Sequence, residues 1–204
     1  MRLFIASTFA DSVKQFYERQ HGGKVLFCAN PSDPFKSKYW VKKDYNAFVK
    51  NGFDVTTIDL RKIDNVQLEV MLKSYKILFI SGGSAVYILD LLHKKKMDTV
   101  IIAAIANGLI YAGTSAGSMI MAPDISICAD DEDEREAKMI GKVKNLKGLG
   151  LMPFYLFCHC QERHYIPSTK RAMNRLPRNK IPLLFLNDGQ ALWIHNSQME
   201  IVQA

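Results

Sequence analysis

The chain alternates short, almost purely apolar runs with longer stretches in which apolar residues recur every three or four positions. The runs predict buried β-strands, and the recurring positions predict helices with one apolar face. Strands are expected over residues 2–7, 24–29, 53–58, 76–81, 109–113, 151–160 and 182–186, followed by a hairpin of 190–195 and 199–202 around Asn196-Ser197. Helices are expected over residues 11–20, 37–50, 65–73, 85–93, 97–106, 116–121 and 168–175.

Strands that alternate with helices indicate repeated βαβ units, in which the strands lie parallel and helices cover both faces of the sheet. The sequence therefore predicts an α/β protein with a mostly parallel sheet. We expect one domain over residues 1–204, because two domains of half that length would each be unusually small. Ligands of such sheets bind beyond the carboxyl ends of the strands, so the loops that follow the strands are the places to look for chemistry.

Composition and charge exclude several classes of protein. Hydrophobic residues make up 48% of the chain and charged residues 23%, which is ordinary for a globular protein and argues against disorder. No apolar run approaches the ~18 residues of a membrane-spanning helix, so no membrane partner is expected. The net charge of +7 comes from scattered lysines and arginines without interleaved aromatic residues. This pattern is typical of a solvated surface and predicts no nucleic-acid partner.

The four cysteines show no C-x-x-C spacing, and the apolar N-terminus lacks the features of a secretory signal. Free thiols in the cytoplasm are therefore expected. The tripeptide Cys158-His159-Cys160 resembles a set of metal ligands. It ends an expected strand, however, and alternate side chains of a strand point to opposite faces. Because His159 should then point away from both thiols, we expect no metal site.

Residues 113–117 read Gly-Thr-Ser-Ala-Gly, which matches G-x-S-x-G between an expected buried strand and an expected short helix. Small neighbours permit a sharp turn that would hold the Ser115 hydroxyl group at the tip of the strand. The free N–H groups at the start of the following helix favour negative charge there. We therefore predict that Ser115 is a nucleophile and that the Ala116 N–H donates to an oxyanion. The alternative is a tight turn with an incidental serine.

A second oxyanion donor should come from another loop at the same edge of the sheet. Gly82 and Gly83 directly follow the strand expected at 76–81, and without side chains their backbone can approach a substrate closely. We predict that Gly82 lies against the substrate and that Gly83 provides the N–H group. The alternative is that both glycines only form the turn into the next helix.

A serine nucleophile needs a base, and two of the five histidines are suitably placed. His159 ends an apolar strand, where catalytic residues of parallel sheets gather, whereas His164 lies further along in a polar segment. We favour His159 over His164, and the alternative is that His159 is a core histidine without a catalytic role. The remaining histidines are interpreted as surface residues: His21, His93 and His195.

A carboxylate should hold the histidine ring in the required tautomer. Residues 130–136 contain six acidic residues and one arginine, and most of this run should be a solvated loop. Asp130, which opens the run, is the main candidate. Asp188, in an Asn-Asp-Gly turn, is a lesser candidate or a purely structural residue.

With these motifs the sequence resembles the dipeptidase E and cyanophycinase family of serine peptidases over most of its length. In that family a double-glycine turn precedes a serine elbow, an acid follows about fifteen residues later, and a histidine ends a later strand. The matching positions here are Gly82-Gly83, Ser115, Asp130 and His159. The resemblance implies the class I glutamine amidotransferase-like fold, which is flavodoxin-like, and a Ser-His-acid triad that needs no cofactor.

The sequence departs from the family pattern at several positions. Ser84-Ala85 stand where Asn-Thr is usual, and Cys158 stands where proline usually precedes the histidine. Residues 161–174 lack the Gly-Glu-Thr-Arg pattern of aspartyl dipeptidases, which leaves Arg171 as the candidate for contacting a substrate carboxylate.

The sequence thus predicts a serine peptidase that hydrolyses short peptides through an acyl-enzyme on Ser115. Two alternatives stay open, an amidase or esterase that acts on a non-peptide substrate and a non-catalytic binding protein of the same fold. Whether the chain forms a homodimer also stays open.

Overall fold

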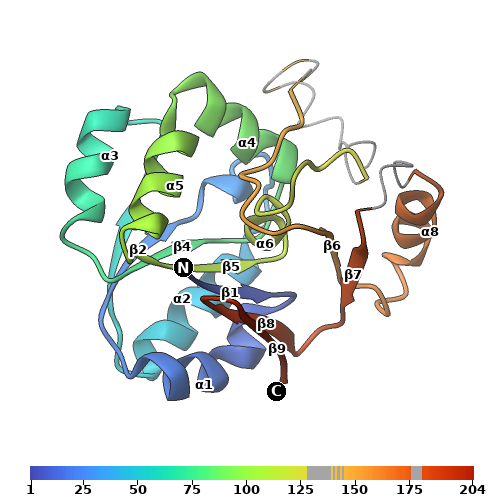
Figure 1. The fold of residues 1–204 in the computed structure, drawn as a ribbon, viewed down its shortest axis with the longest axis horizontal. Coiled ribbons are helices and arrows are strands. Elements are labelled where there is room, and N and C mark those ends of the chain that lie inside the picture. The colour runs from blue at the N-terminus through green and yellow to red at the C-terminus, as the bar shows by residue number, and fades with distance from the viewer. Residues whose placement is uncertain (128–138, 140, 142, 144, 176–180) are drawn as a thin grey trace.

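A computed structural model describes residues 1–127, 139, 141, 143, 145–175 and 181–204 (Figure 1). The strands are β1 (Arg2–Ala6), β2 (Lys24–Cys28), β3 (Asp54–Ile58), β4 (Ile77–Ile80), β5 (Ile110–Thr114), β6 (Tyr155–Cys158), β7 (Leu183–Leu186), β8 (Gln190–His195) and β9 (Gln198–Gln203). The α-helices are α1 (Phe9–Gln20), α2 (Tyr39–Lys50), α3 (Asn65–Leu72), α4 (Ala85–Lys94), α5 (Met97–Ala106), α6 (Ala116–Met119) and α8 (Ile166–Asn174), and a 3₁₀ turn, η1, spans Asn30–Ser32. These elements follow the predicted order, with ends displaced by a few residues.

Seven strands form the main sheet in the order β3-β2-β4-β5-β1-β8-β9. Strands β1 to β5 pair in parallel, whereas β8 and β9 pair antiparallel at one edge. The predicted α/β fold with a mostly parallel sheet is confirmed, as is the closing hairpin. Because β4, β5 and β1 are neighbours, the loops that follow them meet at one edge of the sheet.

The two faces of the main sheet carry separate apolar cores. Successive side chains of a strand point to opposite faces. In β1, Leu3 and Ile5 pack on the side of α3, α4 and α5, whereas Phe4 and Ala6 pack on the side of α1 and α2. Figure 1 shows the two helix layers on opposite sides of the sheet. Because both faces are covered, the central strands are apolar throughout.

Strands β6 and β7 form a parallel pair of their own beside the main sheet. The sequence predicts both strands but not this separation. Strand β1 is already paired on both sides, with β5 and β8, so β6 does not pair with it. In the separate pair Cys158 lies opposite Leu186, so the segments that follow the two strands leave side by side. The pair thus brings a second set of loops toward the carboxyl ends of β1 and β5.

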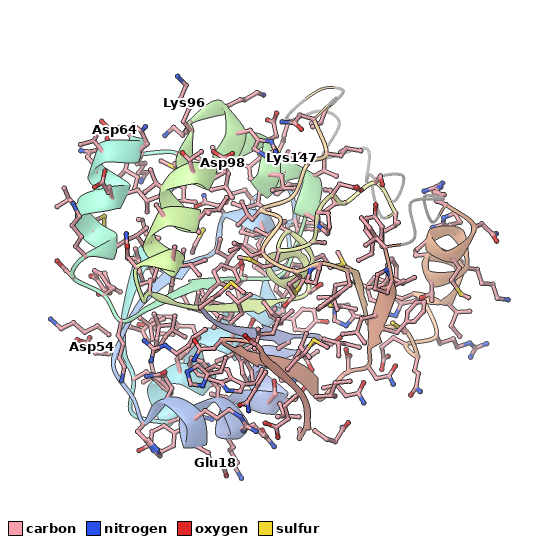
Figure 2. All side chains as sticks on the ribbon, in the orientation of Figure 1. Glu18, Asp54, Asp64, Lys96, Asp98 and Lys147 are labelled. Atoms are coloured by element: carbon pink, nitrogen blue, oxygen red, sulfur yellow. The ribbon has the colours of Figure 1, made fainter. Side chains whose placement is uncertain are left out.

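Charged side chains lie largely at the periphery of the molecule. Exposed examples point outward in Figure 2, among them Glu18, Asp54, Asp64 and Lys96. Among the helices of the described residues, none has the length and apolar character needed to cross a membrane.

Candidate active site

Ser115 lies in a sharp turn between β5 and α6. Its backbone has a φ of 51° and a ψ of −114°, a combination that is strained for a residue with a side chain. A Cβ atom on Gly117 would lie 2.1 Å from the carbonyl oxygen of Ile80. A Cβ atom on Gly113 would lie 2.7 Å from the carbonyl oxygen of Gly117. Close packing of the turn therefore requires both glycines of the motif, and the turn holds the serine just beyond the end of β5.

Glycine at position 115 should relieve this strain. We expect Ser115→Gly to have a free energy of unfolding about 1 kcal/mol higher than that of Ser115→Ala, because glycine adopts a positive φ at little cost. The gain is limited, since glycine is also freer in the unfolded chain. Urea denaturation of the two variants side by side measures the difference. Equal stabilities would show that the strain in the turn is no larger than this entropic cost.

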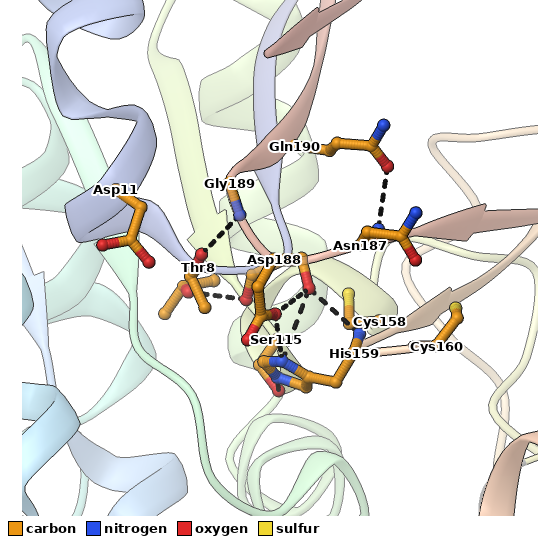
Figure 3. A network of polar contacts seen from close by, with 12 residues as sticks. Thr8, Asp11, Ser115, Cys158, His159, Cys160, Asn187, Asp188, Gly189 and Gln190 are labelled. Carbon is orange, nitrogen blue, oxygen red and sulfur yellow. Dashed lines mark hydrogen bonds and ion pairs between the residues drawn. The ribbon is translucent and has the colours of Figure 1, made fainter. Parts of the chain in front are cut away.

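His159 reaches Ser115 from the separate sheet of β6 and β7. It follows β6 directly and has a φ of 60°. Its Nε2 atom lies 3.0 Å from Ser115 Oγ, within hydrogen-bond distance (Figure 3). His164, the other candidate base, packs its ring against Tyr165 with the ring centroids 4.1 Å apart. The structure thus brings His159 to the serine, and Tyr165 also stacks on the His159 ring at 4.9 Å.

Asp188 contacts the other nitrogen of the His159 ring. Its Oδ1 atom lies 2.6 Å from His159 Nδ1 and accepts a hydrogen bond from Ser7 Oγ at 2.9 Å. Burial raises the pKa of the Asp188 carboxyl group, but the hydrogen bond and charge of His159, aided by Ser7 and Lys43, outweigh burial and leave this pKa below its ordinary value. An ionised carboxylate only accepts hydrogen bonds, so Nδ1 carries the ring hydrogen. With its single hydrogen on Nδ1, the ring offers Nε2 as an acceptor for the serine hydroxyl group.

Asp130, the main acid candidate from the sequence, lies outside the described residues. The position at His159 Nδ1 is occupied by Asp188. An Asn-Asp-Gly triplet reads as a turn, which is why sequence reasoning ranked Asp188 lower. The pairing of β6 with β7 is the signal that would have favoured Asp188 as the acid. Two parallel strands that end together place the residues after them side by side.

The turn after β4 lies against Ser115. A Cβ atom on Gly82 would lie 3.3 Å from the Ser115 Cβ atom. Gly83 has a φ of 142°, and a Cβ atom there would lie 2.2 Å from the carbonyl oxygen of Pro31, so only glycine fits. Within the described part of the chain, the N–H groups of Gly83 and Ala116 have no hydrogen-bond acceptor. Two backbone donors beside the serine are therefore left without a protein partner.

A cavity of about 330 Å³ includes these groups. Gly82, Gly83, Ser115, His159 and Asp188 all line it. Its wall also contains several aromatic side chains, namely Phe35, Tyr39, Trp40 and Tyr165.

Two further features lie outside this cavity. Arg171, the predicted contact for a substrate carboxylate, is not among the lining residues; it is exposed on α8 and donates to Ser168 Oγ at 3.0 Å. A larger cavity of about 640 Å³ lies near the amino ends of β4 and β5. Its described lining includes no serine, cysteine or histidine, so it offers neither a Ser-His nor a Cys-His pair.

The charged groups of the cavity that contains Ser115 are partly neutralised. Lys43 pairs with Asp11 at 2.8 Å. Asp44 is buried and accepts a hydrogen bond from the Ala10 N–H at 3.1 Å, and its burial raises its pKa to about 7. Asp44 therefore gains and loses its proton near neutral pH.

The cysteines beside His159 do not converge with its ring. Cys158 is buried, and Cys160 Sγ lies 3.1 Å from the carbonyl oxygen of Phe157. Both sulfur atoms point away from the imidazole in Figure 3. Among the described residues no group of three metal-ligating side chains is present.

An imidazole that bridges a strained serine and a carboxylate is the arrangement by which serine hydrolases activate their nucleophile. The geometry of the site matches that class of enzymes. The model of peptidase family S51 matches residues 6–202. The chain belongs to this family and is a serine-type peptidase.

Individual relatives agree with the family. An uncharacterised peptidase of Pasteurella multocida (strain Pm70) is 25% identical over 198 residues, which cover 96% of this chain and 94% of the relative. A peptidase E of Streptomyces coelicolor is 25% identical over 166 residues, which cover 76% of this chain and 63% of the relative. The structure of a Listeria monocytogenes EGD-e protein assigned as a peptidase E superposes with a TM-score of 0.89 at 21% identity, over 100% of this chain and 98% of the other. The resemblance to the peptidase E family is thereby confirmed.

Proposed function

We propose that the protein hydrolyses short peptides through an acyl-enzyme formed on Ser115. The observation that carries this proposal is the continuous hydrogen-bond chain from Ser115 Oγ through His159 to Asp188, with distances of 3.0 and 2.6 Å. The cavity of about 330 Å³ lies at the small end of the usual range for ligand sites, about 300–1,000 Å³. Its size favours a peptide of a few residues over a folded protein.

In the first half of the reaction His159 Nε2 takes the hydroxyl proton of Ser115, and Oγ attacks the carbonyl carbon of the scissile peptide bond. The resulting oxyanion accepts hydrogen bonds from the N–H groups of Gly83 and Ala116. Each such donor is typically worth about 2.7–4 kcal/mol of transition-state stabilisation. Asp188 keeps the imidazole in the required tautomer and stabilises its protonated form.

In the second half the protonated His159 gives its proton to the leaving amine, so the C–N bond breaks and the acyl group stays on Ser115. A water molecule then gives a proton to His159 and attacks the ester carbonyl group. The second oxyanion collapses, the Oγ–carbonyl bond breaks, and Ser115 regains its proton from His159. The products are the two peptide fragments, and no cofactor takes part in these steps.

A fluorophosphonate probe, which reacts with activated serines, tests the nucleophile. We expect the wild-type protein to be labelled once, at Ser115 by peptide mapping, and Ser115→Ala not to be labelled, because the hydroxyl group activated by His159 is gone. A labelled Ser115→Ala variant would refute the assignment.

The substrate class is tested with a panel of dipeptides and tripeptides with free N-termini, together with small esters and non-peptide amides. Cleavage of peptides by the wild-type protein but not by Ser115→Ala supports the proposal. Hydrolysis of esters or non-peptide amides with no peptide cleaved would favour an amidase or esterase. If the wild-type protein is not labelled and turns over none of these compounds, the result would favour a non-catalytic binding protein.

A further inference from the structure

Three hydrogen-bond donors converge on the carbonyl oxygen of Gly82. Ser32 Oγ donates at 2.7 Å, Trp40 Nε1 at 3.0 Å and Ser81 Oγ at 3.2 Å. The indole N–H of Trp40 also lies 2.9 Å from Ser32 Oγ, so the two side chains act as one connected group. Ser32 and Ser81 are fully buried and Gly82 is buried as well, so this group of hydrogen bonds is largely shielded from solvent.

We infer that Ser32 and Trp40 are positioning residues that fix and strengthen the Gly83 N–H as an oxyanion donor. This inference rests on the proposed function, because it assigns the two residues to the oxyanion hole of that reaction. The described residues contain no cis peptide bond, and a trans peptide points its N–H opposite to its C=O. Once Ser32 and Trp40 hold the Gly82 carbonyl group on one side, the Gly83 N–H must face the other side.

On that other side the Gly83 N–H meets no acceptor within the described residues. A buried backbone donor is rarely left unpaired, but Gly83 itself is half-buried at the cavity wall. A ligand in the cavity can therefore satisfy it. The hydrogen bonds received by the Gly82 carbonyl group also polarise the peptide unit, which makes its N–H a stronger donor. Position and strength both serve an oxyanion that forms beside Ser115.

The segment that carries Ser32 is itself held against the turn after β4. The backbone N–H of Ser84 donates to the carbonyl oxygen of Pro31 at 2.8 Å. Asn30 Nδ2 donates to Asp33 and to Asp59, each at 2.9 Å. The loop after β2 therefore gives Ser32 a fixed position, and Trp40 approaches from the first turn of α2. Rigid support of this kind is what keeps a catalytic donor in its productive geometry.

The test compares Trp40→Phe, which keeps the aromatic ring and removes the N–H, with Ser32→Ala. Trp193→Phe is the matched control, since Trp193 lies on β8 and packs on Phe4. For each protein the fraction of molecules labelled by the fluorophosphonate at completion and the second-order rate of labelling are measured, with kcat and KM for a peptide that the wild-type protein cleaves. The melting temperature shows whether each variant folds.

Loss of an oxyanion donor typically lowers kcat by about 10²–10³-fold, so loss of one of its supports should cost less, roughly tenfold. We expect Trp40→Phe and Ser32→Ala to lower the labelling rate and kcat by that factor, with KM unchanged and with complete final labelling. Trp193→Phe should match the wild-type protein. A purely structural role would instead lower the fraction of sites that can be labelled and leave the rate per labelled site unchanged.

The outcomes separate this inference from the proposed function. Labelling of wild-type Ser115 combined with unaltered rates in both Trp40→Phe and Ser32→Ala overturns the inference alone. If Ser32→Ala does not fold, Trp40→Phe still decides, because it keeps the ring that packs there. Failure of the wild-type protein to react at Ser115 overturns the proposed function, and the inference with it.

Discussion

A variant that lacks both Ser115 and His159 should hydrolyse peptides no more slowly than a variant that lacks only one of them. Each single replacement by alanine is expected to lower kcat by at least about 10⁴-fold. Without His159 the serine hydroxyl group keeps its proton and is a weak nucleophile. Without Ser115 the imidazole has no nucleophile to activate. The second replacement therefore removes nothing that the first has left in operation.

The measurement is kcat of the three variants on the peptide that the wild-type protein cleaves fastest, with the melting temperature as the check on folding. His164→Ala is the informative comparison and should keep most of its activity, since its ring packs on Tyr165 rather than bonding to Ser115. Losses that multiply in the double variant would mean that Ser115 and His159 act independently. The 3.0 Å contact between them would then not be the catalytic one.

Most of the fold could be predicted because its elements are specified locally. The central strands are buried on both faces, so each appears in the sequence as an apolar run regardless of which strand it pairs with. The segment at 151–160 shows the limit of this reasoning. Its first part is apolar but not a strand, because the backbone N–H groups of Leu151 and Met152 donate to the carbonyl oxygen of Met121 at 3.0 and 3.1 Å. Apolar character predicts burial, but the pairing partner decides the structure.

The candidate site divides in the same way. Ser115 and the two glycines after β4 are set by turns whose tight packing leaves a motif in the sequence. Ser32 and Trp40 have no such signal, because their contact with Gly82 joins segments 50 and 42 residues away. In the sequence Asp188 is recognisable only as part of a turn. It meets His159 because Asp188 follows β7 and His159 follows β6, and these two strands pair only in the folded protein. Contacts between distant segments are what the local pattern does not contain.

Asp188→Asn should lower kcat by about 10³–10⁴-fold, whereas Asp130→Asn should leave it near the wild-type value. An asparagine at 188 offers an amide in place of the carboxylate. If its N–H₂ group faces His159, the ring must accept at Nδ1 and carry its hydrogen on Nε2, the wrong tautomer to take a proton from Ser115. The carboxylate that stabilises the protonated imidazole is lost as well. The effect is therefore expected mainly in kcat rather than in KM.

The two asparagine variants are matched, because each removes one negative charge and changes side-chain volume very little. Labelling by the fluorophosphonate should slow in Asp188→Asn and reach completion, since Ser115 and the oxyanion donors remain. If Asp130→Asn instead shows the large loss of kcat, then Asp130, the residue indicated by the family spacing, is the catalytic acid. The 2.6 Å contact of Asp188 with His159 would then be structural. The lowered pKa of Asp188 favours the first outcome, because a carboxylate that stays ionised can stabilise a positive charge on the imidazole throughout the reaction.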